Sequence, residues 1–175
     1  MFELVTFKDV VKISPKLFNE KISKAARTAL REEYEGTISK NYGVILSIQK
    51  VKVESKGKIF LGDGAVYCDA EFEALTFNPI VNEIIEGRVT EILNFGAFTR
   101  LGPVDALIHV SQIANDFLTF DKRTGMLVAK NSKKTLRKGE LIRARIATIS
   151  WKDTVINSKI ALTMRPPGMG NKKDE

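Results

Sequence analysis

The sequence predicts an α+β domain followed by a small all-β barrel, so the fold class changes along the chain. In the first half, an apolar stripe at helical spacing lies between runs that alternate between apolar and polar residues. This combination is typical of a helix packed on an antiparallel sheet. From Glu83 onward, short apolar runs are separated by frequent glycines, and that spacing is typical of a small barrel.

Residues 3–13 alternate loosely and predict a first strand. We expect a helix to begin at Ser14 and Pro15, because serine caps helices well and proline is tolerated in a first turn. Gly36 is the expected stop signal. The apolar face of this helix, which we expect to pack on a sheet, comprises Phe18, Ile22, Ala25, Ala26, Ala29 and Leu30.

Strands and turns are expected to follow the helix. The apolar positions of residues 44–48 and 51–53 have opposite parity, which predicts a bulge near residues 49–50. Residues 55–58 have the composition of a turn. The string Gly62-Asp63-Gly64 predicts a second, tight turn, because glycine permits positive φ.

Residues 66–77 predict a long strand with one wet face, because the even positions from Val66 to Ala74 are apolar and the odd positions from Asp69 to Glu73 are acidic. The acidic row of Asp69, Glu71 and Glu73 faces either a basic partner or water. The Asn78-Pro79 pair breaks this strand and predicts a domain boundary. The expected domains are therefore 1–80 and 81–168, with a poorly ordered tail at 169–175.

Composition excludes several classes of protein. No apolar run approaches the roughly 18 residues of a membrane span, and residues 1–4 lack the pattern of a signal peptide. The sequence therefore predicts a cytoplasmic protein. Cys68 is the only cysteine and His109 the only histidine. An internal disulfide is excluded, as is a metal site built from a cluster of these residues in one chain, and no cofactor is expected.

The net charge of +7 is concentrated in the second half of the chain. Residues 81–175 contain 16 Lys+Arg and 10 Asp+Glu, whereas residues 1–80 contain 12 and 11. A localised positive field favours a polyanionic partner for the second half. The alternative is a solvated basic surface that keeps the protein soluble.

The most informative stretch is residues 83–113, EIIEGRVTEILNFGAFTRLGPVDALIHVSQI. It resembles the S1-type RNA-binding domain, whose fold is a five-stranded OB barrel. The last two strands are then expected at residues 141–150 and 159–163. The matching residues are Gly87, Val89, Ile92, Phe95-Gly96-Ala97-Phe98, Leu107 and Ile108-His109-Val110-Ser111.

Two phenylalanines are the leading candidates for base stacking. Phe95 and Phe98 lie three residues apart, so an ideal strand would place them on opposite faces. A bulge at Gly96 would bring both rings to one face as a flat platform, on which bases stack with little sequence preference. The alternative is that one or both rings fill the barrel.

Several polar and charged residues are further candidates for contacts with RNA. His109 would add stacking or a hydrogen bond, although a lone histidine is also a common structural hydrogen-bonding group. Charge complementarity to the RNA backbone would come from Arg88, Arg100, Arg143 and Arg145, unless these arginines are merely solvated.

A second basic segment follows residues 115–129, which predict a hairpin with its turn at 121–125. Lys133 and Lys134 are its candidate RNA contacts, and a solvated loop is the alternative. The whole segment comprises Lys130, Lys133, Lys134, Arg137 and Lys138.

The context of the barrel narrows the resemblance. The strings GDGAVY at residues 62–67, FEALTF at residues 72–77 and SKIALTMRPPG at residues 158–168 are similar to those of the archaeal RNA polymerase stalk subunits called E-prime or subunit seven. The likeness covers residues 1–168. One departure is residues 151–157, which lack the arginine-rich loop common in that family.

This resemblance implies a non-catalytic role. The N-terminal half would be a truncated RNP-like tip domain that docks on the polymerase core through loops including Gly62, Asp63 and Gly64. The chain would pair with the F subunit of RNA polymerase, also called the fourth subunit, and bind nascent single-stranded RNA. It would aid promoter opening, elongation and termination.

Two rival interpretations fit the sequence less well. An S1-type subunit of an RNA exosome or a translation factor tends to carry a zinc ribbon or a KH domain, yet Cys-x-x-Cys and Gly-x-x-Gly are both missing here. An enzyme needs a nucleophile, a base and an organising group. Asp105 and His109 have no obvious third partner, and the residues around Gly62 do not match a phosphate-binding loop.

Overall fold

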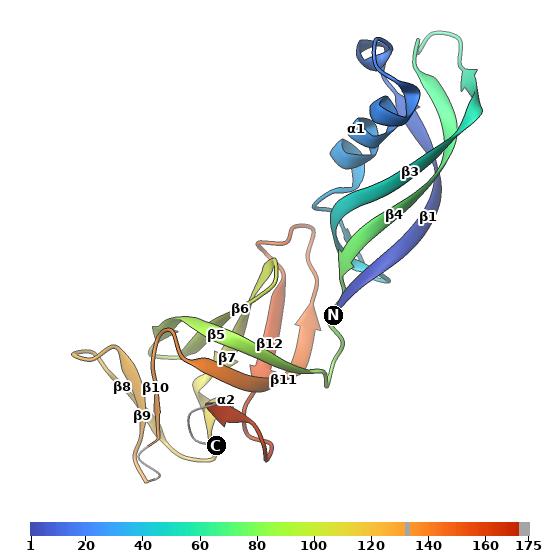
Figure 1. The fold of residues 1–175 in the computed structure, drawn as a ribbon. Coiled ribbons are helices and arrows are strands. Elements are labelled where there is room, and N and C mark those ends of the chain that lie inside the picture. Colours follow the sequence, from blue (N-terminus) through green and yellow to red (C-terminus); the bar gives the residue numbers. More distant parts are fainter. Residues whose placement is uncertain (132–133, 172–175) are drawn as a thin grey trace. The chain divides into compact units, whose positions relative to one another are not determined.

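The chain forms two compact units, Met1–Asn78 and Pro79–Glu175. The computed structural model describes residues 1–131 and 134–171 (Figure 1). The boundary between the units falls at the Asn78-Pro79 pair.

The first unit is a four-stranded antiparallel sheet, in the order β1-β4-β3-β2, with one helix packed on a face (Figure 1). Ala25, Ala26 and Leu30 of the helix are buried in the same core as Phe72 of the sheet. The predicted helix-on-sheet architecture is therefore confirmed. Its elements are β1 (Phe2–Ile13), η1 (Pro15–Leu17), α1 (Ile22–Tyr34), β2 (Ile38–Ser39), β3 (Gly43–Ile59) and β4 (Val66–Phe77).

The predicted start of the helix at Ser14 is wrong. Pro15–Leu17 form only a short 3₁₀ turn, and Ser14 makes no side-chain capping bond within the part of the chain that the structure describes. The α-helix begins at Ile22, and its first buried side chain is Ala25. Packing on the sheet, rather than the local Ser-Pro signal, therefore sets where the helix forms.

The predicted turn at residues 55–58 is also wrong, because β3 continues to Ile59. The register shifts between Val53 and Gly57 without reversing the chain. A Cβ on Gly57 would lie 2.4 Å from Cγ1 of Val66, so this glycine permits close approach of the next strand.

Two other local predictions in this unit are confirmed. The register of β3 shifts between Ile48 and Val51, where the change of parity predicts a bulge. Gly62 and Gly64 have φ of +95° and +68°, as their tight turn requires.

The second unit contains a closed five-stranded barrel. Its strands follow the order β12-β7-β6-β5-β11, and β11 closes the ring by pairing with β12. β7 and β12 are parallel and the other pairs are antiparallel. The elements of this unit are β5 (Ile84–Leu93), β6 (Gly96–Leu101), β7 (Val104–His109), α2 (Val110–Ile113), β8 (Leu118–Asp121), β9 (Met126–Ala129), β10 (Thr135–Leu136), β11 (Leu141–Ser150), β12 (Lys159–Thr163) and β13 (Gly170–Asn171).

The last two barrel strands, β11 and β12, coincide with the predicted ranges. The predicted hairpin is also present, as β8 and β9, and β10 extends it to a three-stranded sheet (Figure 1). Of the expected tail, Gly170–Asn171 pair with β11, and residues 172–175 lie outside the described part of the chain. No helix within residues 1–131 and 134–171 is long and apolar enough to cross a bilayer.

Candidate nucleic-acid interface

The outer face of β6 exposes part of the motif that the sequence singles out. Ala97, Thr99 and Leu101 are buried inside the barrel, whereas Phe98 is half-buried and Arg100 is exposed. Alternate residues of a strand point to opposite faces. Phe98 therefore belongs to the outer face and not to the barrel core.

The predicted bulge at Gly96 is wrong. β6 pairs with β7 in unbroken register from Gly96 opposite His109 to Leu101 opposite Val104. A Cβ on Gly96 would lie 2.2 Å from the carbonyl oxygen of Ile108, so glycine permits close strand approach here. In the β5–β6 pair the register shifts instead within β5, between residues 89 and 91.

Phe95 comes beside Phe98 because it lies in the turn before β6. Its carbonyl oxygen accepts a hydrogen bond from the backbone N–H of Val110, at 2.8 Å. The Phe95 side chain is 43% exposed, and the two ring centroids are 6.2 Å apart with an interplanar angle of 88°. The two rings are therefore packed edge to face. The predicted flat platform is wrong, because the two ring planes are nearly perpendicular.

His109 lies at the end of β7, opposite Gly96. Its Nδ1 accepts a hydrogen bond from the backbone N–H of Ser111, at 3.3 Å, and lies 2.8 Å from the Ser111 hydroxyl. The ring thus caps α2, which places the proton of the neutral imidazole on Nε2. Because the residue is also exposed, this structural role leaves part of the ring open to a ligand.

The four candidate arginines differ in their local partners. Arg100 Nε lies 3.4 Å from Asp105 Oδ1, and Arg143 Nη2 lies 3.3 Å from Glu86 Oε1. The Arg100 pair is exposed, and such pairs contribute little, so its guanidinium group is open to another anion. Arg88 Nη1 donates to the Gly139 carbonyl at 2.8 Å. Arg145 Nε is buried and has no hydrogen-bond partner in the described part of the chain.

The structure brings only some of the candidates together. Phe95, Phe98, Arg100 and His109 share the outer surface of β6 and β7. Arg88 lies on β5, which pairs directly with β6. Arg143 and Arg145 lie on β11, on the far side of β5 from β6. Adjacent strands lie about 4.8 Å apart, so β11 is roughly 10 Å from β6.

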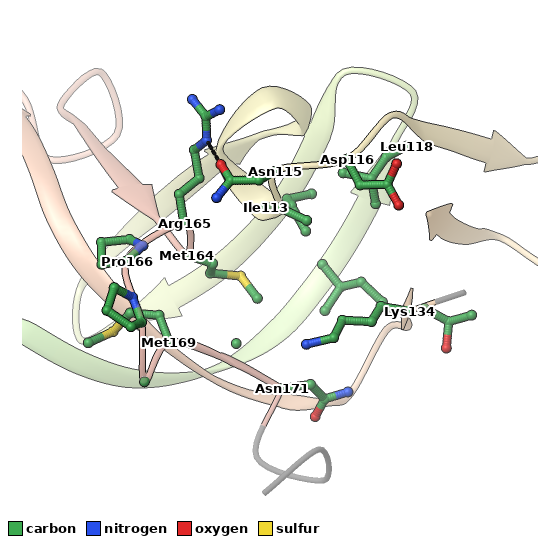
Figure 2. A pocket seen from close by; sticks show the side chains of 16 residues that line it. Ile113, Asn115, Asp116, Leu118, Lys134, Met164, Arg165, Pro166, Met169 and Asn171 are labelled. Carbon is green, nitrogen blue, oxygen red and sulfur yellow. Dashed lines mark hydrogen bonds between the residues drawn. The ribbon is translucent and has the colours of Figure 1, made fainter. Parts of the chain in front are cut away.

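Of the two candidate lysines, the structure describes Lys134, and it does not join this group. Lys134 immediately precedes β10 in the separate three-stranded sheet, where it lines a pocket (Figure 2). Lys133 lies outside the described residues.

The turn after β3, which contains Gly62-Asp63-Gly64, follows three exposed apolar residues and is held by side-chain bonds of Asp63. Ile59, Phe60 and Leu61 are 69%, 57% and 105% exposed. Asp63 Oδ2 lies 2.9 Å from Lys12 Nζ and accepts a hydrogen bond from the Tyr67 hydroxyl. These bonds, that from Tyr67 first, lower the pKa of the Asp63 carboxyl. Asp63 therefore holds the turn while the apolar residues before it face solvent.

The acidic row on β4 is partly paired within its own sheet. Glu71 Oε2 lies 3.3 Å from Lys8 Nζ, and Glu73 Oε2 lies 3.1 Å from Lys50 Nζ. These exposed pairs favour a solvated charged face over a surface reserved for a basic partner. Among the residues that the structure describes, no group of three or more His, Cys, Asp or Glu side chains could hold a metal ion.

One aromatic group on the barrel unit was missed by sequence reasoning. Phe117 is 67% exposed, and Lys130 Nζ lies 5.2 Å from the centroid of its ring. The sequence assigns both residues to a hairpin and a basic run. The sequence could have indicated this pair, because an aromatic residue comes before the predicted hairpin and the basic run follows it. The two strands of an antiparallel hairpin bring these positions side by side.

Comparison with known families agrees with the two-unit division. Residues 8–64 match the family described as "SHS2 domain found in N terminus of Rpb7p/Rpc25p/MJ0397". Residues 78–158 match the "S1 RNA binding domain" family. The N-terminal unit is thus an α+β SHS2 domain and the second unit an S1/OB barrel.

Curated relatives match over almost the whole chain. "DNA-directed RNA polymerase subunit Rpo7" of Sulfolobus acidocaldarius is 41% identical over 170 residues, which cover 97% of this chain and 92% of the relative. The protein of the same description from Saccharolobus solfataricus is 38% identical, with 97% and 94% covered. "DNA-directed RNA polymerase II subunit rpb7" of Dictyostelium discoideum is 28% identical, with 83% and 86% covered.

Proposed function

The chain belongs to the Rpo7 family of DNA-directed RNA polymerase subunits, and we propose that its S1 domain binds nascent single-stranded RNA. It is a non-catalytic stalk subunit. Nucleotide addition therefore takes place elsewhere in the enzyme, and the contribution of this chain is binding.

The pair formed by exposed Phe95 and half-buried Phe98, flanked by Arg100 and His109, is the observation that supports RNA binding most directly. Stacking of a base on an aromatic ring contributes roughly 1–3 kcal/mol and tolerates any base. Among the described residues, the side chain of Arg100 is held by its exposed ion pair with Asp105, so its guanidinium group can turn to a phosphate. A transcript of changing sequence requires this kind of sequence-tolerant contact.

Fluorescence anisotropy with a labelled single-stranded RNA tests the proposal. Replacing Phe95 and Phe98 by Ala should weaken binding at least roughly tenfold, since about 1.4 kcal/mol corresponds to that factor. Phe60→Ala is the matched control, because Phe60 is an exposed ring on the other unit. Equal affinities of the double variant and the control, with both folded, would rule out the aromatic pair as the RNA contact.

We further propose that the tip of the first unit docks on the polymerase core. The support is the row Ile59, Phe60 and Leu61, whose exposure is unusual for consecutive apolar residues. The turn that follows requires glycine, because Gly62 and Gly64 both have positive φ. Valine at both positions should abolish recovery of the chain with tagged core polymerase while RNA binding is retained. Normal recovery with the core would contradict the docking role.

The remaining parts of the proposal come from family membership. The chain is proposed to act in the cytoplasm, to pair with the F subunit of RNA polymerase, and to aid promoter opening, elongation and termination. Mass spectrometry of a native pull-down tests the partners directly. Recovery of exosome or ribosomal proteins in place of polymerase subunits would contradict it.

A further inference from the structure

A pocket in the second unit lies apart from the β6–β7 face. It has a volume of about 430 Å³, within the range of small-ligand sites. Three segments form it: the chain after α2, the start of β10, and the segment that follows β12 (Figure 2). The separation of the three segments along the sequence explains why no sequence motif predicts it.

The floor of this pocket is apolar. Ile113, Leu136 and Met164 are buried side chains that line it, and Pro166 adds a flat apolar wall. A thioether makes favourable contacts with aromatic rings, and a proline ring adds apolar surface that an aromatic group can cover. The floor therefore suits a flat ring better than it suits a charged or flexible chain.

The charges around the pocket favour an anion. Lys134 reaches from the start of β10 into the hollow, and Arg165 stands at the rim, where its Nε donates to Asn115 Oδ1 at 2.6 Å (Figure 2). The acidic side chain of the lining is Asp116. Its carboxylate accepts from the backbone N–H groups of Phe117 and Asn131, at 2.7 and 2.9 Å. That carboxylate is therefore used to fix the loop.

We propose that this pocket binds one nucleotide of an RNA chain, with the base on the apolar floor and the phosphate at Lys134 and Arg165. Phe117, next to Asp116 in the chain, is an exposed ring with Lys130 beside it. A neighbouring base can stack there, as in single-strand binding sites that alternate rings and cations. The inference rests on the proposed function only for the class of ligand, because it uses none of the residues of the β6–β7 face.

Mononucleotide titration of the full-length, ¹⁵N-labelled chain tests the proposal. Uridine and adenosine monophosphates should shift the backbone amides of Asn115, Thr135 and Arg165. Inorganic phosphate at the same concentration should shift them less, because it leaves the floor empty. Lys134→Glu should weaken nucleotide binding roughly fivefold, the upper range for an exposed charge contact. Lys138→Glu, which makes the same charge change outside the pocket lining, should have less than about half that effect.

The outcomes separate this site from the β6–β7 face. Pocket shifts that persist in the Phe95→Ala/Phe98→Ala variant and weaken with Lys134→Glu support the proposal, whatever that double variant does to binding of longer RNA. Three results would overturn it: shifts confined to the β6–β7 face, equal shifts with inorganic phosphate, or equal weakening by the two lysine variants.

Discussion

Replacement of Gly96 by alanine probes how closely β6 and β7 approach. The added Cβ would lie 2.2 Å from the Ile108 carbonyl oxygen and 3.1 Å from the His109 Cα. Both obstacles are backbone atoms, so no side-chain rotation can relieve them. The two strands must separate locally, and Phe95 and His109 must move with them.

The expected cost follows from packing. Forcing an extra carbon into a packed interior costs typically 1–3 kcal/mol. With a urea dependence of about 2 kcal/mol per molar, the midpoint of unfolding should fall by roughly 1 M. Trp151 is the only tryptophan of the chain and lies in the second unit, so its fluorescence follows barrel unfolding without a contribution from the first unit.

Arg100→Ala is the matched control on the same strand. Arg100 is exposed and its ion pair with Asp105 is solvated, so its loss should change stability by less than about 1 kcal/mol. Gly96→Ala should also weaken RNA binding, because the ring pair moves. A Gly96→Ala protein with the control's midpoint and unshifted amides at Ile108 and His109 would refute the close-approach explanation.

Three further predictions concern other parts of the chain. The buried Thr99 hydroxyl has no hydrogen-bond partner in the described part of the chain. Thr99→Val should therefore leave barrel stability unchanged or raise it by up to about 1 kcal/mol in the same Trp151 assay. A loss of about 2 kcal/mol or more would contradict this prediction. The pKa of Asp63 is lowered in the folded chain, so the carboxylate stabilises the fold above the ordinary carboxyl pKa. This stabilisation is lost as the pH falls through the pKa of the folded state. In a pH series of melting temperatures, Asp63→Asn should remove this loss at acid pH, and an unchanged pH dependence would contradict the prediction. RNA affinity should fall with salt at a log–log slope of about −0.7 per phosphate neutralised, measured by anisotropy, and a flat dependence would exclude the basic contacts.

Long periodic segments were predictable from the sequence because one pattern fitted them. The alternation that begins at Val66 and the family likeness at residues 141–150 and 159–163 located strands to the residue. Ser14-Pro15 and residues 55–58 misled because their signals are local. A cap or a turn composition is compatible with several tertiary settings, and contacts with the sheet decided which one formed.

The site was predictable in its residue types but not in its geometry. The sequence left open whether Phe95 and Phe98 share one surface or fill the barrel, because a glycine in a strand allows either a bulge or a close approach. Only the register with β7 distinguished these. The partners of Arg100 and Arg143 likewise depend on cross-strand neighbours that one sequence does not reveal.

We expect RNA to lie on the outer face of β6 and β7, and photo-crosslinking can show whether it does. A 4-thiouridine-labelled single strand should be bound to the intact chain, irradiated, and its crosslinked peptides identified by mass spectrometry. Crosslinks at Phe95, Phe98 or His109 are the predicted result. Efficient crosslinking to the first unit alone, with none to β6 or β7, would contradict RNA binding on this face.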